Sequence, residues 1–249
     1  LPGKRESVRY IGEHILTQND ILSGGNFSDI VAYGGWTMDD HNPKGMLANT
    51  SEDTPSIMHP APSPYGIPYR CLYSVNIKNL CFAGRNISAT HAAMSSTRVM
   101  GTCSLLGQAL GTAVSICIRE NILPCEIKGI LIEELQQMLL NDGVFLPQIP
   151  RNISKLTLEA KTNLSEENEK LLFNGIDRPR SDEEKNQIIL NPKDSIEFEF
   201  SEVSEVKELR IQFDLDFKRK SVSPNMKMQW FAQKLHTGLD FVPMKVAAT

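Results

Sequence analysis

The sequence predicts an α+β fold followed by an antiparallel β-sandwich. Two observations in the 249-residue chain support this prediction. Residues 1–125 contain short β-branched segments that lead into one long helix rich in small residues. Residues 151–249 contain alternating apolar and polar residues and no sustained helical pattern beyond about residue 175. We therefore expect two domains, joined by a helix and a linker over residues 126–150.

Short strands are expected in the first domain. Residues 4–17 show partial alternation and end at the turn-like Gln-Asn-Asp, and residues 28–36 form a second strand that runs into a glycine pair. Residues 42–68 are rich in proline and poor in large aliphatic residues, which indicates an ordered surface loop outside the core. Residues 69–75 and 80–83 are further strand candidates.

A long helix is expected from about residue 96 to residue 121. Its apolar residues recur at spacings of three and four, with Gly101, Gly107 and Gly111 interleaved. Glycine inside a helix costs about 1 kcal/mol relative to alanine, so three glycines indicate that another group approaches the backbone closely. That group is either a bound ligand or a sheet on which the helix packs tightly.

A second amphipathic helix is expected over residues 131–140, and Asn-Asp-Gly at 141–143 is typical of a helix end. Pro147 and Pro150 then indicate the linker. Beyond it, the strings SIEFEF at 195–200 and VKELRIQFDLDF at 206–217 alternate as strands do, and residues 241–246 are a further candidate. These strands are the basis for the predicted β-sandwich.

Composition excludes several classes of partner. The net charge is −4 and the lysines are spread along the chain, so a nucleic acid is not an expected partner. We found no apolar run of the roughly 18 to 20 residues that spans a bilayer, and we expect no membrane span. The five cysteines form no CxxC pair and no zinc-like spacing with histidine, which indicates buried apolar thiols rather than a disulfide framework or a metal site.

The turn after Phe82 is a candidate site. A strand, a glycine turn and a helix N-terminus hold an anion or a polarised carbonyl group, because the first helical N–H groups are unpaired and the helix dipole is positive there. Ser95, Ser96 and Thr97 are suitable N-cap residues for the expected helix. An ordinary helix cap has the same pattern.

The string AGRNISATHAAMSSTRVMGTCSLLGQALGTA, at 83–113, closely resembles the last FAD-contacting segment of a family of bacterial FAD-dependent oxidoreductases. Three more segments are similar to that family in the same order: GKRESVRYIGEHILTQNDI, VAYGGWTMDDHNP and PYGIPYRCL. The resemblance covers about half of the chain. It implies an FAD-binding Rossmann-like domain with a substrate domain inserted in it.

The resemblance also implies cofactor contacts. The helix that follows strand 80–83 would point its N-terminus at the flavin, and Gly101 would let the ring approach the backbone. Arg85 stands where many FAD proteins have an acid that binds ribityl hydroxyls, and a cation cannot accept those bonds. The resemblance still implies that Arg85 contacts FAD, for example at the pyrophosphate. The residues implied to bind FAD are Gly84, Arg85, Ser88, Gly101, Thr102 and Cys103.

Four residues are catalytic candidates. In more distant flavoproteins that look similar here, an arginine at the place of Arg98 binds a substrate oxyanion; the alternative role for Arg98 is to cap a neighbouring carbonyl. His41 and Asp39, in the string MDDH, and His91 are the acid–base candidates, because histidine titrates near neutrality and a carboxylate orients it. A purely structural role is the alternative for each histidine.

Substrate contacts are assigned to Tyr69 and Arg70, in the string GIPYR. The resemblance implies hydride transfer between a small organic substrate and the flavin. No G-x-G-x-x-G string, which receives the ADP pyrophosphate, occurs in the chain. We therefore expect a C-terminal fragment of a longer enzyme, inactive alone.

The string LLFNGIDRPR, at 171–180, together with the alternating strands after it, looks like a discoidin or galactose-binding-like jelly roll. This second resemblance implies an alternative function for the chain, as a non-catalytic module that binds a glycan.

Overall fold

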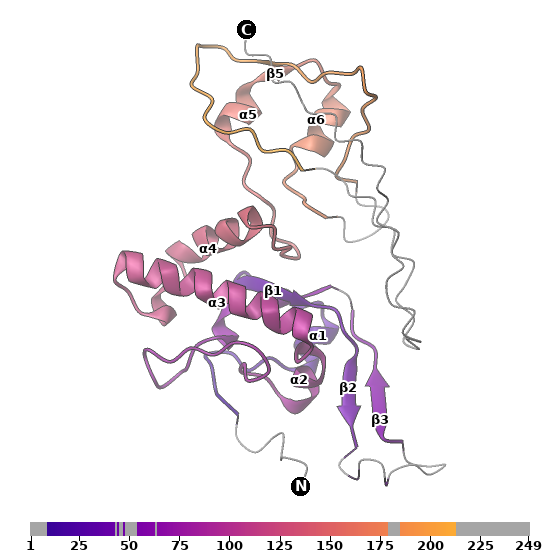
Figure 1. Cartoon of the computed structure of the whole chain (residues 1–249), viewed down its shortest axis with the longest axis vertical. Coiled ribbons are helices and arrows are strands. Elements are labelled where there is room, and N and C mark those ends of the chain that lie inside the picture. Colours follow the sequence, from indigo (N-terminus) through magenta and orange to yellow (C-terminus); the bar gives the residue numbers. More distant parts are fainter. Residues whose placement is uncertain are drawn as a thin grey trace. The chain divides into compact units, whose positions relative to one another are not determined.

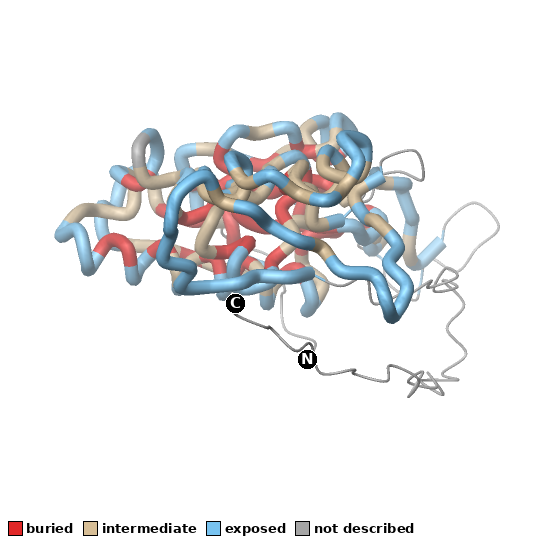
Figure 2. The backbone as a smooth tube through the Cα atoms, turned by 90° about the horizontal axis from the view of Figure 1, so that it is seen from above, coloured by how far each residue is buried: buried red, intermediate tan, exposed pale blue. Residues whose placement is uncertain are grey.

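The computed structural model describes residues 9–42, 44, 47, 54–62, 64–178 and 185–212. The chain divides into two compact units, Leu1–Glu208 and Leu209–Thr249. Of the second unit only residues 209–212 are described, and they form neither helix nor strand. The first unit contains the core, which appears as the buried segments in Figure 2.

A short helix, α1 (Gln18–Leu22), lies where the sequence predicts the end of a strand and a turn. The Thr17 hydroxyl accepts the N–H of Asp20, and the Asp20 carboxylate accepts the N–H of Thr17, so both sides of a capping box are present. The described part of the predicted strand, residues 9–17, makes only isolated bridges, Gly12 to Ser74 and Leu16 to Ala89. The prediction of a strand was therefore wrong for these residues.

The predicted strand over 28–36 is confirmed as β1 (Ile30–Gly34). It pairs antiparallel with β4 (Tyr65–Pro68), every residue of which is buried. The prediction that residues 42–68 lie outside the core was thus wrong at its C-terminal end. Pro68 ends the strand and Gly66 lies against the backbone of Gly25, so proline and glycine sit inside the core here instead of marking a loop.

A second antiparallel pair joins β2 (Met38–His41) to β3 (Ser56–His59), with Met38 opposite His59 and His41 opposite Ser56. Only the first residue of this pair, Met38, is fully buried. The pair is drawn beside α2 in Figure 1, and the contacts of β2 with that helix are what position the candidate site.

The strand candidates at 69–75 and 80–83 are replaced by irregular structure. Tyr69–Cys71 form a 3-10 helix, and a single bridge joins Tyr73 to Cys81. The backbone is nevertheless paired with its neighbours, since Phe82 N–H donates to the carbonyl of Leu72 over 2.8 Å. Pairing without a regular ladder satisfies the buried backbone groups of this segment.

The predicted long helix is two helices, α2 (His91–Thr97) and α3 (Met100–Glu120). The Thr90 hydroxyl caps α2 by accepting the N–H of Ala93, and the extended backbone of Val99 separates the two helices. Ser95, Ser96 and Thr97, predicted as N-caps, instead lie buried inside α2. The earlier start arises because Thr90 is an effective N-cap and His91 to Thr97 tolerate helix.

One face of α3 packs on β1 and on α4 (Ile130–Asn141). The glycines lie on the other face: no atom of the described residues comes within 4 Å of a Cβ placed on Gly101, Gly107 or Gly111. Tight packing on a sheet therefore does not account for these glycines within the part of the chain that the structure describes.

Helix α3 is also long and apolar enough, by length and composition, to cross a membrane, and it is the one such helix among the described residues. This corrects the statement that no apolar run reaches that length. Core helices of other proteins pass the same test, and the buried face of α3 contributes Leu106, Ala109, Ala113 and Ile116 to the core. Length and composition alone therefore do not indicate a membrane span.

The second predicted helix is confirmed as α4, which ends before Asp142 and Gly143, the latter at φ +83°. A 3-10 turn, Pro124–Glu126, connects α3 to it. After α4 the chain continues into the core through buried Val144 and Leu146. Pro147, the first proline of the expected linker, therefore follows directly on a core residue.

The described part of residues 151–212 contains two short helices, α5 (Lys155–Glu159) and α6 (Glu166–Leu172), and one antiparallel pair of two-residue strands, β5 (Lys161–Thr162) and β6 (Phe198–Glu199). The predicted strand over 195–200 is thus reduced to β6, and residues 206–212 are not a strand. The remaining predicted strands, 213–217 and 241–246, lie outside the described residues. An α+β mixture is confirmed; a β-sandwich does not form in the part described.

Candidate functional site

The C-terminal end of α2 lies against β2. Arg98, the C-cap residue of α2, donates from Nη2 to the carbonyl oxygen of Asp39 over 3.3 Å and to its Oδ2 over 3.2 Å. Both side chains are mostly buried, with 22% of Arg98 and 16% of Asp39 exposed. The structure therefore brings together two residues that the sequence predicts to be catalytic.

His41, two residues further along β2, joins the same cluster. Its Nε2 lies 2.8 Å from Nη2 of Arg98, and its Nδ1 lies 2.8 Å from the hydroxyl oxygen of Ser56. A guanidinium group can only donate, so Nε2 is the acceptor and the single proton of the neutral ring is on Nδ1, directed at Ser56. The lone pair that a general base would use is therefore already occupied by Arg98.

His91 forms a separate pair. Its Nε2 lies 2.7 Å from Oδ1 of Asp40, and both side chains are about half exposed. His91 is the first residue of α2, whereas Asp40 lies on β2 between Asp39 and His41. A carboxylate that orients an accessible imidazole is the usual arrangement for an acid–base histidine. We did not predict Asp40, although its position in the string MDDH was a usable signal.

Three buried polar atoms near these segments have no hydrogen-bond partner among the described residues: Oδ1 of Asp39, Oγ1 of Thr97 and Oγ of Ser88. Buried polar atoms are normally paired, and those that are not require an explanation. Asp39 and Thr97 belong to the two segments that meet at Arg98. The predicted cofactor residue Ser88 pairs through its backbone instead, donating to the carbonyl of Cys71 and accepting from the N–H of Leu16.

The N-terminus of α3 starts two residues after Arg98. Its N-cap residue, Val99, has no side chain that can accept from the first N–H groups. Gly101 is exposed with open space around it, Thr102 is buried, and Cys103 donates from Sγ to the carbonyl of Thr97 over 3.6 Å. This end of the helix is therefore uncapped by side chains and open at Gly101.

The other predicted cofactor residues lie in the preceding turn. Gly84 has a φ of +90°, which favours glycine, and its carbonyl accepts from the N–H of Ile87. Arg85, next to it, is exposed. It lies near Arg9, whose pKa is lowered by burial first and by the charge of Arg85 second.

Tyr69 and Arg70 have structural partners. The Tyr69 side chain is fully buried, its hydroxyl donates to the carbonyl of Pro124 over 2.9 Å, and burial raises its pKa well above the usual range. Arg70 donates from Nε and Nη2 to the two carboxylate oxygens of Asp29, over 3.0 and 3.2 Å. Tyr69 therefore offers no group to a substrate in this arrangement, and the guanidinium of Arg70 is already bound.

All five cysteines are free thiols; Cys71 and Cys117 are buried as predicted, whereas Cys81, Cys103 and Cys125 are only partly buried. Burial raises the pKa of Cys71, which keeps this thiol protonated and unreactive. Among the residues that the structure describes, no three histidine, cysteine or acidic side chains come close enough to hold a metal ion.

A comparison with protein-family models matches residues 1–139 to the family described as FAD dependent oxidoreductase. The match covers more than half of the 249 residues. The chain belongs to the FAD dependent oxidoreductase family. No curated protein and no solved structure matches it.

Membership of this family implies that FAD is the cofactor and that the reaction is an oxidation or a reduction. The matched residues include every predicted site residue and the elements that carry them, from α1 to most of α4. The comparison does not extend to the residues after 139, and neither it nor the structure supports the alternative function of a carbohydrate-binding module.

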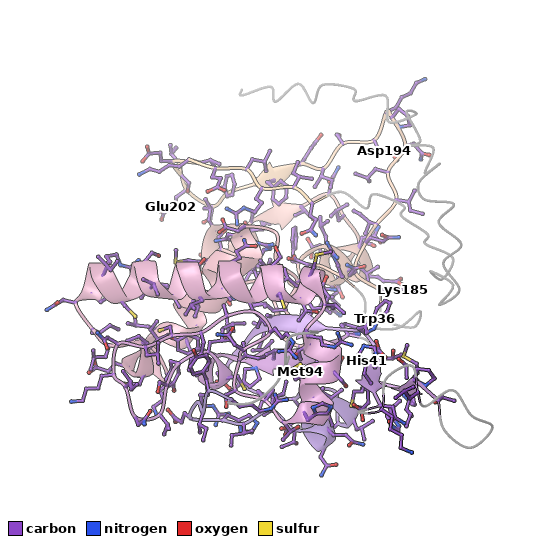
Figure 3. The ribbon with its side chains drawn as sticks, turned by 60° about the horizontal axis from the view of Figure 1, so that its bottom comes forward. Trp36, His41, Met94, Lys185, Asp194 and Glu202 are labelled. Atoms are coloured by element: carbon purple, nitrogen blue, oxygen red, sulfur yellow. The ribbon has the colours of Figure 1, made fainter. Side chains whose placement is uncertain are left out.

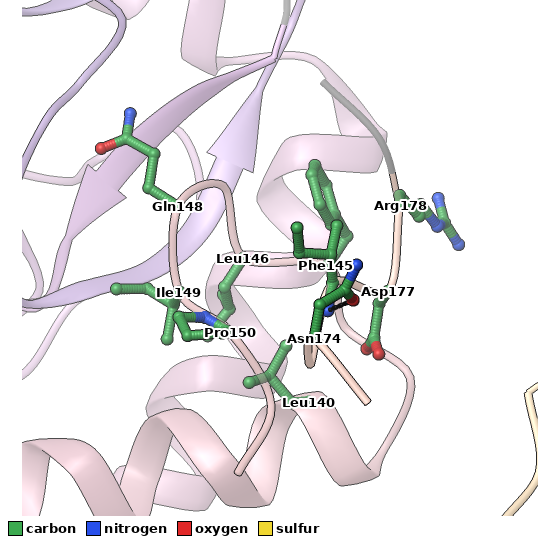
Figure 4. A pocket seen from close by; sticks show the side chains of 10 residues that line it. Leu140, Phe145, Leu146, Gln148, Ile149, Pro150, Asn174, Asp177 and Arg178 are labelled. Carbon is green, nitrogen blue, oxygen red and sulfur yellow. Dashed lines mark hydrogen bonds between the residues drawn. The ribbon is translucent and has the colours of Figure 1, made fainter. Parts of the chain in front are cut away.

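A cavity of about 280 Å³ lies outside the family match (Figure 4). None of the predicted catalytic or cofactor residues lines it. Its walls are formed by the end of α4, the segment after it and the turn after α6, through Leu140, Phe145, Leu146, Gln148, Ile149, Pro150, Asn174, Ile176, Asp177 and Arg178.

Proposed function

We propose that the chain carries the substrate-side part of a flavoenzyme active site and that the enzyme transfers hydride between an anionic organic substrate and FAD. Arg98 binds the substrate anion, and His91, oriented by Asp40, accepts or returns the proton that accompanies the hydride. His41 and Asp39 hold Arg98 in place. Bound FAD supplies the hydride acceptor.

The single observation that carries this proposal is the continuity of Arg98 with the open end of α3. The guanidinium contacts β2 through Nη2, and two residues later the N-terminus of α3 begins without a side-chain cap. A group that lies over the helix end is therefore next to the arginine. A flavin ring at the helix end and a substrate at the arginine would be neighbours.

The residues present fit the isoalloxazine end of FAD. The uncapped N–H groups at the start of α3 favour an electron-rich carbonyl edge, because the helix dipole is positive there. A Cβ on Gly101 would meet no described atom within 4 Å, which leaves space for a ring edge. The unpartnered Thr97 hydroxyl lies in the same turn and is a further candidate donor.

Arg98 retains donors for a substrate. Its contacts with described residues all run through Nη2, so Nε and Nη1 are directed elsewhere. A guanidinium group presents its donors in a fixed fork that matches a carboxylate. Asp39 and His41 fix the plane of this fork, which orients the substrate without taking part in the reaction.

His91 is the better proton acceptor of the two histidines. The Nε2 of His41 is occupied by Arg98, whereas His91 is about half exposed and is oriented by a carboxylate. Transfer of a proton to His41 would first require the guanidinium to turn away, because a protonated Nε2 cannot accept from it. We therefore assign the acid–base role to His91.

The adenosine half of FAD requires a separate site, because the chain contains no G-x-G-x-x-G string. The proposal is tested in FAD-loaded protein that has this site, by anaerobic bleaching of the flavin absorption with organic anions. Replacing Arg98 by Gln removes a charge-assisted contact worth about 1.5 to 3 kcal/mol, so KM should rise roughly tenfold to a hundredfold. Arg119→Gln, at the far end of α3, is the control. An unchanged KM in Arg98→Gln would refute the assignment.

A further inference from the structure

Ser96 joins three segments that are distant in the sequence. Its hydroxyl donates to the carbonyl of Trp36, in the connection between β1 and β2, over 2.5 Å. The hydroxyl of Tyr65, on β4, lies 2.5 Å from the same oxygen. Ser96 and Tyr65 are fully buried. Figure 3 labels Trp36, whose carbonyl Ser96 contacts, and His41, which lies further along the chain on β2.

The direction of this chain of hydrogen bonds is fixed by chemistry. A carbonyl oxygen only accepts, so the single proton of Ser96 is directed at Trp36. Tyr65 must then donate to Ser96. Ionised Tyr65 could not do so, and burial raises its pKa to about 12, so it holds the proton at any ordinary pH. The hydrogen bonds therefore have one direction: Tyr65 donates to Ser96, and Ser96 donates to the carbonyl of Trp36.

Gly34 leaves space for the Tyr65 side chain in this series of hydrogen bonds. The two residues are opposite one another in the β1–β4 pair, and a Cβ on Gly34 would lie 2.3 Å from the Tyr65 hydroxyl oxygen. The tyrosine ring therefore crosses over the strand backbone at the glycine. This is how the hydroxyl reaches α2.

Helix α2 is attached to residues 36–41 by the His91–Asp40 pair at its start and by two contacts at its C-terminal end. Ser96 holds the carbonyl of Trp36, and Arg98 holds the carbonyl and carboxylate of Asp39. The attachment points are two residues apart on the helix and three apart on the other segment. Two neighbouring contacts hold this end of the helix in place along the strand, and Ser96 makes the one that lies before β2.

We infer that Ser96 is a positioning residue, which through Trp36 holds β2 where Asp39 and His41 meet the guanidinium of Arg98. This inference rests on the proposed function only in giving the Arg98 cluster its role in substrate binding. The contact geometry itself is independent of FAD.

Replacing Ser96 by Ala removes both hydrogen bonds and leaves the Tyr65 hydroxyl and the Trp36 carbonyl to find new partners. Buried groups without partners are costly, so the segment around Trp36 is expected to shift. Arg98 then loses its fixed approach to His41. Replacing Tyr65 by Phe leaves the bond from Ser96 to Trp36 intact, so it should lower stability without disturbing His41.

The state of His41 reports on this arrangement without any cofactor. Nε2 of His41 lies 2.8 Å from Nη2 of Arg98, which can only donate, so this geometry requires the proton of a neutral ring to be on Nδ1. Nitrogen-15 NMR distinguishes the two tautomers of an imidazole. The measurement is made on the full chain without FAD, at about pH 8.5, where a free imidazole is neutral.

We expect one tautomer in the parent chain and in Tyr65→Phe, and loss of that preference in Ser96→Ala. Ser95→Ala is the matched control, since Ser95 is also buried in α2 but its hydroxyl donates to Ala92 of the same helix over 2.6 Å. Circular dichroism confirms that each variant is folded. Retention of the single tautomer in folded Ser96→Ala, or its loss in Ser95→Ala, overturns the inference; neither result affects the test of FAD reduction.

If Ser96→Ala does not fold, Ser96→Cys provides the second test. The thiol is a weaker donor of similar size, and we expect an intermediate tautomer preference. A preference equal to that of the parent would overturn the inference as well, because it would show that a strong bond to Trp36 is unnecessary.

Discussion

Arg151 and Asp177 form a paired ion bridge, with Nε 3.1 Å from Oδ1 and Nη2 2.6 Å from Oδ2, and both side chains are at most 15% exposed. The same guanidinium donates to the carbonyl of Leu140 and to the side chain of Asn141, each over 2.6 Å. One side chain thus caps the end of α4 and binds the turn after α6. Arginine is favourable at a helix C-terminus because the helix dipole is negative there.

We predict that Arg151→Met destabilises the chain by about 3 kcal/mol, because it leaves Asp177 mostly buried without its counter-ion. The double variant Arg151→Met with Asp177→Leu should recover part of this loss, since neither charge remains. Arg178→Met, at an exposed residue, is the control. Chemical denaturation measures all four free energies. Equal losses in the single and double variants would show that the ion pair is not the cause.

Glycines in this fold differ in what surrounds them, and the difference predicts opposite effects. Gly101→Ala should raise stability by up to about 1 kcal/mol, because no described atom lies near the new methyl group and alanine favours helix. Gly34→Ala should lower stability, because its methyl group would collide with Tyr65. Thermal unfolding compares the two. A loss of stability in Gly101→Ala would contradict the open environment of α3.

Gly101→Val separates folding from cofactor binding. In the longer, FAD-loaded protein the branched side chain stands where we place the flavin edge, so FAD occupancy should fall while thermal stability changes by less than about 0.5 kcal/mol. Gly107→Val, further along the same exposed face, is the control and should keep its FAD. Equal flavin absorbance per protein in Gly101→Val and the parent would refute the placement of the ring.

The capping box of α1 predicts a pH dependence. Burial raises the pKa of Asp20, but hydrogen bonds from the N–H and hydroxyl of Thr17 and from His14 lower it more, so the net shift is downward. A lowered pKa in the folded state stabilises the protein above the unfolded value of about 4, and this contribution is lost as the pH falls through the folded value. Asp20→Asn should therefore cost about 1 kcal/mol at pH 7 and progressively less below pH 4.

Denaturation midpoints of Asp20→Asn and the parent chain, measured between pH 7 and about pH 3, test this dependence. Glu159→Gln, exposed on α5, is the control for a general loss of negative charge. A difference between Asp20→Asn and the parent that stays constant over this range would exclude the carboxylate of Asp20 as its source.

The elements that the sequence predicted correctly are those whose pattern is local. The apolar run of β1, and the periodicity and Asn-Asp-Gly end of α4, needed no distant partner. Errors arose where one residue decides the outcome: Thr90 moves the start of the helix forward by several residues, and Thr17 turns an expected turn into α1. The β4 strand was missed because its proline and glycine are placed by contacts with β1 and Gly25.

The candidate site was partly predictable. The resemblance named Arg98 and the string MDDH named Asp39 and His41, and the structure brings these residues into contact. The sequence did not reveal that Nε2 of His41 faces Arg98. The orientation of the His41 ring depends on its other nitrogen, Nδ1, which faces Ser56 on the neighbouring strand. The assignment of Tyr69 to the substrate was not supported, because its hydroxyl donates to the carbonyl of Pro124. No local sequence pattern indicates this contact.

The predicted domain boundary at residue 150 remains a prediction, and Arg151 sharpens its test. A polypeptide of residues 151–249 retains the ion pair with Asp177 but loses the contacts with Leu140 and Asn141. Folding of this polypeptide, measured by circular dichroism, would support an independent C-terminal domain. An unfolded spectrum would indicate that attachment to α4 is required.

The last prediction concerns FAD itself. Most of the affinity for a dinucleotide comes from its adenosine and pyrophosphate half, which a Gly-rich turn and helix N-terminus usually hold, and no G-x-G-x-x-G string occurs in this chain. The start of α3 offers the isoalloxazine edge only a few N–H groups. A charge-assisted hydrogen bond is worth about 1.5 to 3 kcal/mol, whereas association costs about 4 to 15 kcal/mol in lost freedom.

Two or three such bonds leave little net affinity, so the 249-residue chain should bind FAD with a Kd weaker than about 1 µM and should show no turnover alone. Isothermal titration of the purified chain with FAD measures this Kd, and Gly101→Val determines whether any weak binding that occurs is at α3. A Kd tighter than about 1 µM, unaffected by Gly101→Val, would require a nucleotide site elsewhere in the chain. It would also remove the reason for placing the adenosine half outside these residues.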